Sequence, residues 1–151
     1  MRICLYTEAN HQAEFYHQCK VHGIECALEV NTPAGRHDLV VLNAARNAFV
    51  AIVECKKTGS HTDPNSWQLT RYRMIGVPVY LLKSGADALP LLQRIIRETS
   101  GKEPVSIAAI GQMEHIRKIR SERRIARRLA RERSGSITTP SEPGQKFWIS
   151  Y

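Results

Sequence analysis

Three charged residues lie at the ends of apolar segments, where side chains of their types can do chemistry together. Asp38 lies at the start of the apolar run 37–43, and Glu54 and Lys56 lie at the end of the run 48–56. Paired carboxylates can hold Mg²⁺ or Mn²⁺, because these ions prefer hard oxygen ligands. A lysine beside such an ion can position a water molecule or stabilise charge that develops on a phosphate. The residue types therefore indicate a candidate metal site with a neighbouring lysine.

The two apolar runs are predicted to pair as a hairpin. Both are rich in Val, which favours strands buried on both faces, and Ala45-Arg46-Asn47 lies between them at hairpin length. With the loop centred on Arg46, paired residue numbers sum to 92, so that Asp38 faces Glu54. Their Cβ atoms would then be about 4.5–5.5 Å apart, and Lys56 would share the face of Glu54. Facing carboxylates destabilise a sheet unless a divalent cation lies between them.

The same residues also have a purely structural interpretation. Glu54 and Lys56 would then form an ordinary ion pair at a strand end, and Asp38 would end a turn. A third motif favours the functional interpretation, since Gln68 and Tyr72 open the next predicted helix one turn apart on one face. Plain core packing is the alternative for Tyr72.

Three motifs in this order resemble those of the PD-(D/E)XK nuclease superfamily: Gly35-x-x-Asp38, Glu54-x-Lys56 and Gln68-x-x-x-Tyr72. The third motif looks like that of the RecB-like and lambda-exonuclease-like branch. The segments 52–56 and 76–82 also resemble the small VRR-NUC and Holliday-junction-resolvase-like members. The resemblance covers about residues 8–100, and it departs from the superfamily pattern at His37, which stands where the superfamily name has Pro.

The resemblance implies a restriction-endonuclease-like αβββαβ core and a catalytic site. Asp38, Glu54 and the backbone carbonyl of Cys55 would bind Mg²⁺ or Mn²⁺. Lys56 would act on the attacking water or on the phosphate. The reaction would be phosphodiester hydrolysis that leaves a 5′-phosphate.

Further residues match the superfamily by position. Gln68 would belong to the catalytic site, and Gln68 and Tyr72 would steady it or touch the nucleic-acid backbone. Glu14, on the first predicted helix, matches an acidic residue that some members place near the metal. The alternative for Glu14 is a solvated helix glutamate.

The elements that would position these residues form an α/β domain with a mixed β-sheet flanked by helices. An apolar stretch opens the chain at 3–6, and a turn is predicted at 32–36. The strand 24–30 alternates in polarity, so one of its faces is expected to be exposed. Helices are predicted at 10–22, 67–75 and 87–98, and strands at 24–30, 37–43, 48–56 and 77–83.

Positive charge is concentrated near the C-terminal end. The chain has 22 Lys and Arg against 14 Asp and Glu, a net charge of +8, and residues 114–133 hold nine basic and three acidic side chains. We expect residues 105–133 to form a basic C-terminal helix that binds the phosphates of DNA or, as an alternative, of RNA. A solvated helix packed on the body is the structural alternative. The expected contacts are Arg117, Lys118, Arg120, Arg123, Arg124, Arg127, Arg128 and Arg131.

The chain is expected to divide into a nuclease core (1–103), a basic helical segment (104–134) and a Ser/Pro linker with an aromatic tail (135–151). The tail is expected to dock on this body or on a second copy, which leaves a homodimer or higher homo-oligomer open. The sequence has no run of about 18 apolar residues and no secretory signal. We therefore expect a cytoplasmic or nucleoid-associated protein with no membrane partner.

These observations favour a small stand-alone deoxyribonuclease that depends on Mg²⁺ or Mn²⁺ and acts as an endonuclease rather than an exonuclease. No base-reading motif is visible, so cutting would be structure-directed or weakly specific. Two alternatives stay open: a nucleic-acid-binding accessory without catalysis, and an assembly protein that uses residues 105–151 to contact a partner.

Overall fold

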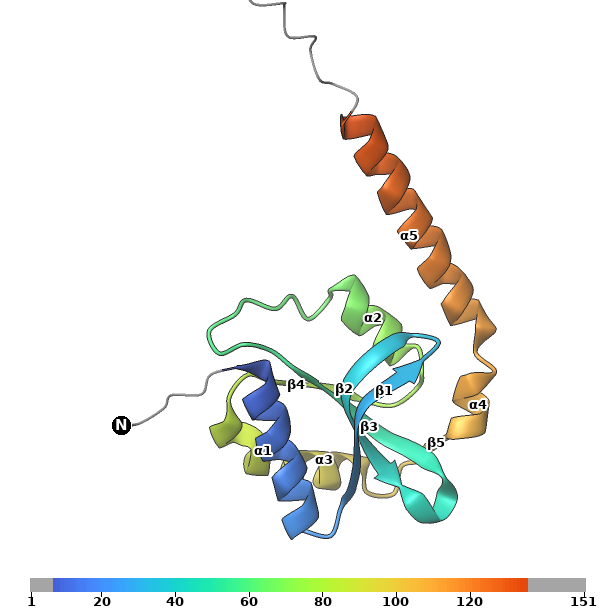
Figure 1. Ribbon diagram of the computed structural model, residues 1–151. Helices are drawn as coiled ribbons and strands as arrows, with labels where there is room; N and C mark the ends of the chain where they lie inside the picture. Colours follow the sequence, from blue (N-terminus) through green and yellow to red (C-terminus); the bar gives the residue numbers. More distant parts are fainter. Residues whose placement is uncertain (1–6, 136–151) are drawn as a thin grey trace, which may run out of the picture. The chain divides into compact units, whose positions relative to one another are not determined.

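The computed structural model describes residues 7–135, which fold into helices and strands in mixed order (Figure 1). The order α1, β1, β2, β3, α2, β4 confirms the predicted αβββαβ succession and the α/β class. The strands are β1 (Glu25–Thr32), β2 (Gly35–Asn43), β3 (Ala48–Cys55), β4 (Val79–Leu82) and β5 (Val105–Ser106). The helices are α1 (Glu8–Val21), α2 (Trp67–Arg73), α3 (Ala88–Thr99), α4 (Ile107–Gly111) and α5 (Glu114–Gly135), with single 3₁₀ turns η1 (Ala44–Arg46) and η2 (Gly85–Asp87).

The sheet is mixed, and its strand order is β1-β2-β3-β4, with β5 paired to β3. β1, β2 and β3 pair antiparallel, whereas β4 runs parallel to β3. The predicted hairpin register is confirmed, because Leu39 pairs with Val53 and Val40 pairs with Ile52. A bulge after Val41 shifts the pairs nearer the hairpin loop by one residue. Asp38 and Glu54 are the next residues beyond the Leu39–Val53 pair, as the predicted register requires.

Helices cover both faces of the sheet, and each face has its own apolar core. α1 and α3 pack on one face, where Phe15 and Leu92 are fully buried among side chains of β2, β3 and β4. α2 and α4 contribute to the core on the other face, which holds Leu69 and Ile110 beside side chains of β2 and β3. The two faces alternate along each strand, so neighbouring strand residues belong to different cores.

This alternation decides where the polar residues at the strand ends point. Val40 and Ile52 belong to the core on the α2 face, and Asp38 and Glu54 lie two residues from them on their respective strands. Glu54 therefore lies on the α2 face of the sheet, and Asp38 lies beside it at the end of the neighbouring strand. α2 begins at Trp67, and the hydroxyl of Ser66 caps it by accepting a hydrogen bond from the N–H of Leu69.

The first two strands depart from the prediction. β1 ends at Thr32 and β2 begins at Gly35. The turn between them therefore has two residues rather than the predicted five. The predicted alternation of β1 fails at Leu28, which is 43% exposed. β1 is an edge strand, and the positive φ of Glu29 (52°) interrupts its regular pleat next to Leu28.

The segment after Glu103 is not the continuous helix that we predicted. Val105 pairs with Phe49 in the sheet, and a short helix, α4, precedes the long helix α5. Ile110 of α4 and Ile116 of α5 are buried in the core of the α2 face. The compact unit therefore extends to Arg117, and a second unit begins at Lys118.

Two further predictions concern the ends of the chain. α5 includes Gly135, where we placed the start of the linker. The apolar stretch 3–6 and the aromatic tail lie outside the described residues. None of the helices that the structure describes is long and apolar enough to cross a membrane.

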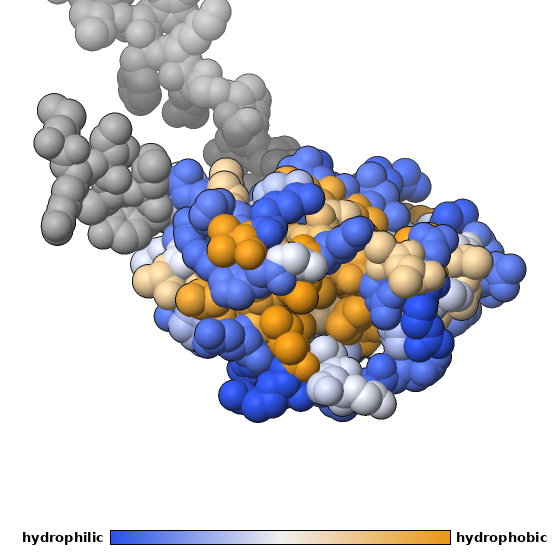
Figure 2. Space-filling view, turned by 90° about the horizontal axis from the view of Figure 1, so that it is seen from below, coloured by the Kyte–Doolittle hydropathy of each residue, from blue (hydrophilic) through white to orange (hydrophobic). Residues whose placement is uncertain are grey.

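An apolar face lies at the far end of the body from the carboxylates. Figure 2 shows apolar side chains gathered there around a groove of about 530 Å³. The groove lies between the start of β1, the β2–β3 hairpin and α3, and its lining includes Ile24, Val50, Ile95 and Ile96.

Candidate active site

The centre of the site is a hydrogen-bonded group of three side chains from β3, the segment after it and α2. The ammonium of Lys56 lies 2.7 Å from Oε1 of Glu54, and the Gln68 amide donates to the same oxygen at 2.8 Å. Lys56 also donates to Oε1 of Gln68 at 3.4 Å. Thus the second and third sequence motifs meet in one cluster, which fixes the orientation of each side chain.

Asp38 lies beside this cluster, on the neighbouring strand. Its Oδ2 accepts a hydrogen bond from the backbone N–H of Cys55 at 2.8 Å, and its backbone carbonyl accepts from the amide of Gln12 on α1 at 2.9 Å. These bonds hold Asp38 next to the end of β3. The predicted proximity of Asp38 to Glu54 is therefore present in the fold.

Glu54 is a carboxylate in an unfavourable environment. It is 3% exposed, and its Oε2 is buried with no hydrogen-bond partner among the described residues. Burial raises the pKa of the Glu54 carboxyl and the charge of Asp38 raises it further, while the hydrogen bonds from Lys56 and Gln68 act in the opposite direction. An unpaired buried oxygen of this kind is stabilised by a cation.

Lys56 is positively charged in this arrangement. Burial alone would lower the pKa of its ammonium group, but the hydrogen bond and charge of Glu54, with the charges of Asp38 and Glu8, raise the pKa above its ordinary value. A protonated lysine donates hydrogen bonds and cannot accept a proton. Lys56 is thus equipped to stabilise negative charge on a phosphate oxygen rather than to act as a base.

Tyr72 is a buried side chain that bonds to Gln68 of the cluster. It is 2% exposed, its hydroxyl donates to the carbonyl of Arg36 at 2.5 Å, and it accepts from the amide of Gln68 at 3.0 Å. Burial raises the pKa of this phenol. Our prediction that Tyr72 touches a nucleic-acid backbone is wrong, because its hydroxyl is enclosed by protein. It steadies Gln68 instead, which was the other role considered.

Gly35 explains why the first motif begins with glycine. Its φ is +138°, a conformation that side chains rarely adopt, and a Cβ built there would lie 3.4 Å from Cε1 of Tyr72. The absence of a side chain lets the Tyr72 ring pack against the β2 backbone. The Gly35 and Tyr72 positions of the two motifs are therefore linked by packing.

His37 is the buried neighbour of Asp38. Its Nε2 lies 2.7 Å from the hydroxyl of Thr32, and its ring contacts that of Tyr72 edge to face at 4.2 Å between centroids. Burial, with the charge of Arg71, lowers the pKa of His37 to about 4. The imidazole is therefore neutral at physiological pH, and it points into the core of the α2 face beside Tyr72.

Glu14 does not join the carboxylates. It accepts a hydrogen bond from Gln18 on its own helix at 3.0 Å, and its side chain packs against Gly85. α1 packs on the opposite face of the sheet from Glu54, so the sheet lies between Glu14 and Glu54. The assignment of Glu14 near a metal is therefore not supported by its position.

A different acid of α1 acts on the site. The charge of Glu8 raises the pKa of both Lys56 and Cys55. Glu8 lies one turn before Gln12, which contacts the backbone of Asp38, so both residues occupy the face of α1 nearest the strand ends. In the sequence, Glu8 could have been found by its spacing of four residues from Gln12. That spacing is informative only when the face of α1 that packs on the sheet is known.

The donor set fits a hard divalent ion. Two carboxylates, Asp38 and Glu54, lie at adjacent strand ends, and an oxygen of Glu54 lacks a partner. Within residues 7–135, no group of three or more His, Cys, Asp or Glu side chains is arranged to hold a metal ion. Mg²⁺ is commonly bound through only one or two carboxylates, with waters and substrate phosphates completing its shell. Asp38, Glu54 and the Cys55 carbonyl are the groups that would hold it.

The thiol of Cys55 lies away from this site. Burial raises the pKa of the Cys55 thiol to about 12, with contributions from the charges of Asp38 and Glu54. Its side chain faces the core shared by α1 and α3, whereas Glu54 faces α2. Only the backbone of Cys55 is therefore available at the site.

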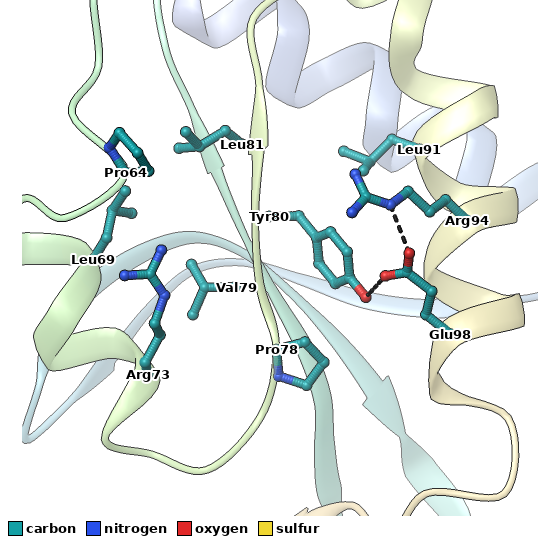
Figure 3. A pocket seen from close by; sticks show the side chains of 10 residues that line it. All are labelled: Pro64, Leu69, Arg73, Pro78, Val79, Tyr80, Leu81, Leu91, Arg94 and Glu98. Atoms are coloured by element: carbon teal, nitrogen blue, oxygen red, sulfur yellow. Dashed lines mark hydrogen bonds and ion pairs between the residues drawn. The ribbon is translucent and has the colours of Figure 1, made fainter.

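A hollow of about 520 Å³ lies along the free side of β4, between α2 and α3 (Figure 3). Glu98 on its α3 side accepts from the hydroxyl of Tyr80 at 2.7 Å and from Arg94 at 2.8 Å, and Arg73 lies across the hollow on α2. None of the residues that line it belongs to the Glu54 cluster.

The basic residues predicted to contact phosphates lie on α5, and all of them are exposed: Arg117, Lys118, Arg120, Arg123, Arg124, Arg127, Arg128 and Arg131.

No family model, no curated protein and no solved structure matches this chain. The functional argument therefore rests on the geometry and chemistry of the site.

Proposed function

We propose that this protein hydrolyses phosphodiester bonds in DNA with the help of Mg²⁺ or Mn²⁺, at the cluster formed by Asp38, Glu54, Lys56 and Gln68. The observation that carries the proposal is the buried, partnerless Oε2 of Glu54 next to Asp38 and Lys56. A purely structural ion pair would satisfy Glu54 within the protein. Here one buried oxygen of Glu54 has no hydrogen-bond partner among residues 7–135.

The fold is compatible with this proposal. The αβββαβ order, with β4 parallel to β3, agrees with the restriction-endonuclease-like core that the sequence motifs imply. The three motifs come from β2, β3 and α2. Gln68 bonds to Glu54 and Lys56, and the hydroxyl of Tyr72 donates to the carbonyl of Arg36 on β2. This agreement supports the nuclease assignment over an ordinary strand-end ion pair.

Each residue has a defined task in the proposed reaction. Asp38, Glu54 and the Cys55 carbonyl would bind the ion, which lowers the pKa of a bound water and stabilises charge on the phosphate. Lys56, held by Glu54 and Gln68, donates to a phosphate oxygen on which negative charge develops. Gln68 orients both Lys56 and Glu54, and Tyr72 fixes Gln68.

The proposal is tested by cleavage of supercoiled plasmid and of end-labelled linear duplex, with Mg²⁺, with Mn²⁺ and with EDTA. We expect nicked circles with either ion and none with EDTA. Lys56→Ala should reduce cutting by at least about 100-fold, as loss of a charge-stabilising donor does in other enzymes. Lys57→Ala is the matched control, because this exposed neighbour has no place in the cluster.

Other outcomes identify the alternatives. Shortening of linear DNA while circles survive would assign an exonuclease. Tight, salt-sensitive binding without cutting under every condition would contradict the proposal and favour a non-catalytic nucleic-acid-binding accessory. Equal activity of Lys56→Ala and Lys57→Ala would place the reaction at another site.

A further inference from the structure

The nine basic side chains of α5 fall into two groups. Five have a polar or electrostatic partner: Arg117 lies 3.1 Å from Glu114, Lys118 4.0 Å from Glu122 and Arg128 3.7 Å from Glu132, and Arg123 and Arg133 also have one. The other four have none within residues 7–135, and all are exposed: Arg120, Arg124, Arg127 and Arg131.

The four unpaired arginines form one stripe along the helix. Their positions are i, i+4, i+7 and i+11, which places them within about 60° of each other around the axis. They span about 16 Å, with steps of about 4.5–6 Å between neighbours. Below, this set of four residues is called the arginine stripe.

The other side of α5 has a different character. Ile125 and Leu129 are exposed, at 51% and 44%, and lie about 130° and 170° around the helix from the middle of the arginine stripe. The three acids of the helix also lie off the stripe, where they pair with the off-stripe basic residues. The positive charge of the stripe is therefore not neutralised by the helix itself.

We propose that the arginine stripe binds the phosphate backbone of duplex DNA along one strand, without reading its sequence. This proposal deepens the proposed function, because it names how the substrate is held. Four exposed guanidiniums at steps of about 4.5–6 Å supply one cation for each of four phosphates of a strand. Arginine forms forked hydrogen bonds to phosphate oxygens, and four unpaired guanidiniums supply these without first breaking an ion pair.

The test measures binding of a 30-base-pair duplex by fluorescence anisotropy from 50 to 200 mM salt, with the full chain and EDTA present. The stripe variant changes Arg120, Arg124, Arg127 and Arg131 to Gln. The control variant changes Arg117, Lys118, Arg128 and Arg133 to Gln. Both remove four positive charges from the same helix, and Gln has nearly the helix propensity of Arg. Circular dichroism verifies that α5 is retained in both.

Four phosphate contacts contribute about −3.6 to the slope of log affinity against log salt for duplex DNA. We expect the stripe variant to lose about this much slope. Wild-type affinity should then fall about 100-fold more than that of the stripe variant over this salt range. The control variant should lose less than a third of that slope. A single-stranded oligonucleotide should show a smaller loss, of about 2.8.

Three results would overturn the inference. Equal losses in the two variants would show that only net charge matters, and no loss in either would place binding elsewhere. Tighter binding to phosphatidylserine vesicles than to duplex at the same salt would favour a membrane surface. Binding is measured without the metal, so its failure is distinct from a failure of cleavage.

Discussion

Asp38 on β2 and Cys55 on β3 are joined by a hydrogen bond from the Cys55 backbone N–H to Oδ2 of Asp38, at 2.8 Å. This bond lies one step beyond the last regular pair of the two strands. It draws the Asp38 carboxylate toward the end of β3, next to the buried carboxylate of Glu54. A strand-end contact thus holds together two like charges that would otherwise separate.

Two substitutions of Asp38 separate its structural task from its charge. Asp38→Asn keeps an oxygen acceptor for the Cys55 N–H and removes the repulsion of Glu54, so its stability in EDTA should equal or exceed that of the wild type. Asp38→Ala leaves the N–H without its acceptor and should be about 1–3 kcal/mol less stable than Asp38→Asn. Urea denaturation measures this difference. Equal stabilities would show that the hydrogen bond contributes nothing.

Divalent cations should stabilise the wild type. Binding to the folded state at 100 times the dissociation constant adds about 2.7 kcal/mol to the free energy of unfolding. The effect of Mg²⁺ or Mn²⁺ on the melting temperature should vanish in Glu54→Gln, which removes one ligand charge. Thermal melting with and without EDTA measures it. If neither ion changes the melting temperature of the wild type, the result would argue against metal binding at this cluster.

Glu8 and Glu14 should differ in their effect on metal affinity. The charge of Glu8 acts at Lys56 and Cys55, whereas Glu14 is bonded to Gln18 and lies on the opposite face of the sheet from Glu54. Glu8→Gln should weaken Mn²⁺ binding a few-fold, and Glu14→Gln should leave it unchanged. Titration calorimetry distinguishes them. The reverse order of effects would restore Glu14 as the residue near the metal.

Tyr72→Phe should affect stability more than chemistry. It removes the hydroxyl that donates to the Arg36 carbonyl and accepts from Gln68, at a cost of about 1–3 kcal/mol in the free energy of unfolding. Gln68 keeps its bonds to Glu54 and Lys56, so cleavage should fall less than in Gln68→Ala. Urea denaturation and plasmid cleavage measure the two effects. A phosphate-binding role for Tyr72 would instead weaken DNA binding at unchanged stability.

His37 should make the fold sensitive to mild acid. Its pKa is lowered to about 4 by burial, and its ordinary value is 6.5. The depressed value means that the stabilising effect of the neutral ring is fully present above pH 6.5 and is lost as the pH falls from 6.5 to 4. The loss amounts to roughly 3 kcal/mol.

The variant His37→Gln isolates this contribution, because it keeps a polar side chain and cannot titrate. Denaturation at pH 7 and at pH 4 should show a larger acid-induced loss for the wild type than for the variant. Parallel pH dependences of the two proteins would mean that the imidazole is solvated and titrates normally.

Much of the site was predictable from local patterns. Centring the 45–47 loop on Arg46 gives the register of the two apolar strands, and the register brings Asp38 to Glu54. The four-residue spacing of Gln68 and Tyr72 fixes their common face on α2. These relations involve neighbours along a helix or across a hairpin, which sequence spacing determines.

Other features depended on how the elements pack. Val105 joins the sheet beside Phe49, and Ile116 closes a core, so the body extends past Glu103. Nothing in the local pattern of 105–116 distinguishes this from the start of a helix. The burial of Tyr72 likewise depends on Gly35, which is distant in the sequence and supplies the space for the ring.

The sequence by itself therefore determined the order of the elements from α1 to β4, the register of β2 and β3 beyond the bulge, and the residues that carry charge. Only the tertiary structure decided that the charge of Glu8 reaches Lys56 and Cys55 while Glu14 bonds to Gln18, because the face that α1 turns to the sheet is chosen by packing. It also decided which arginines of α5 lack a partner, since ion pairing depends on side-chain positions that composition does not contain.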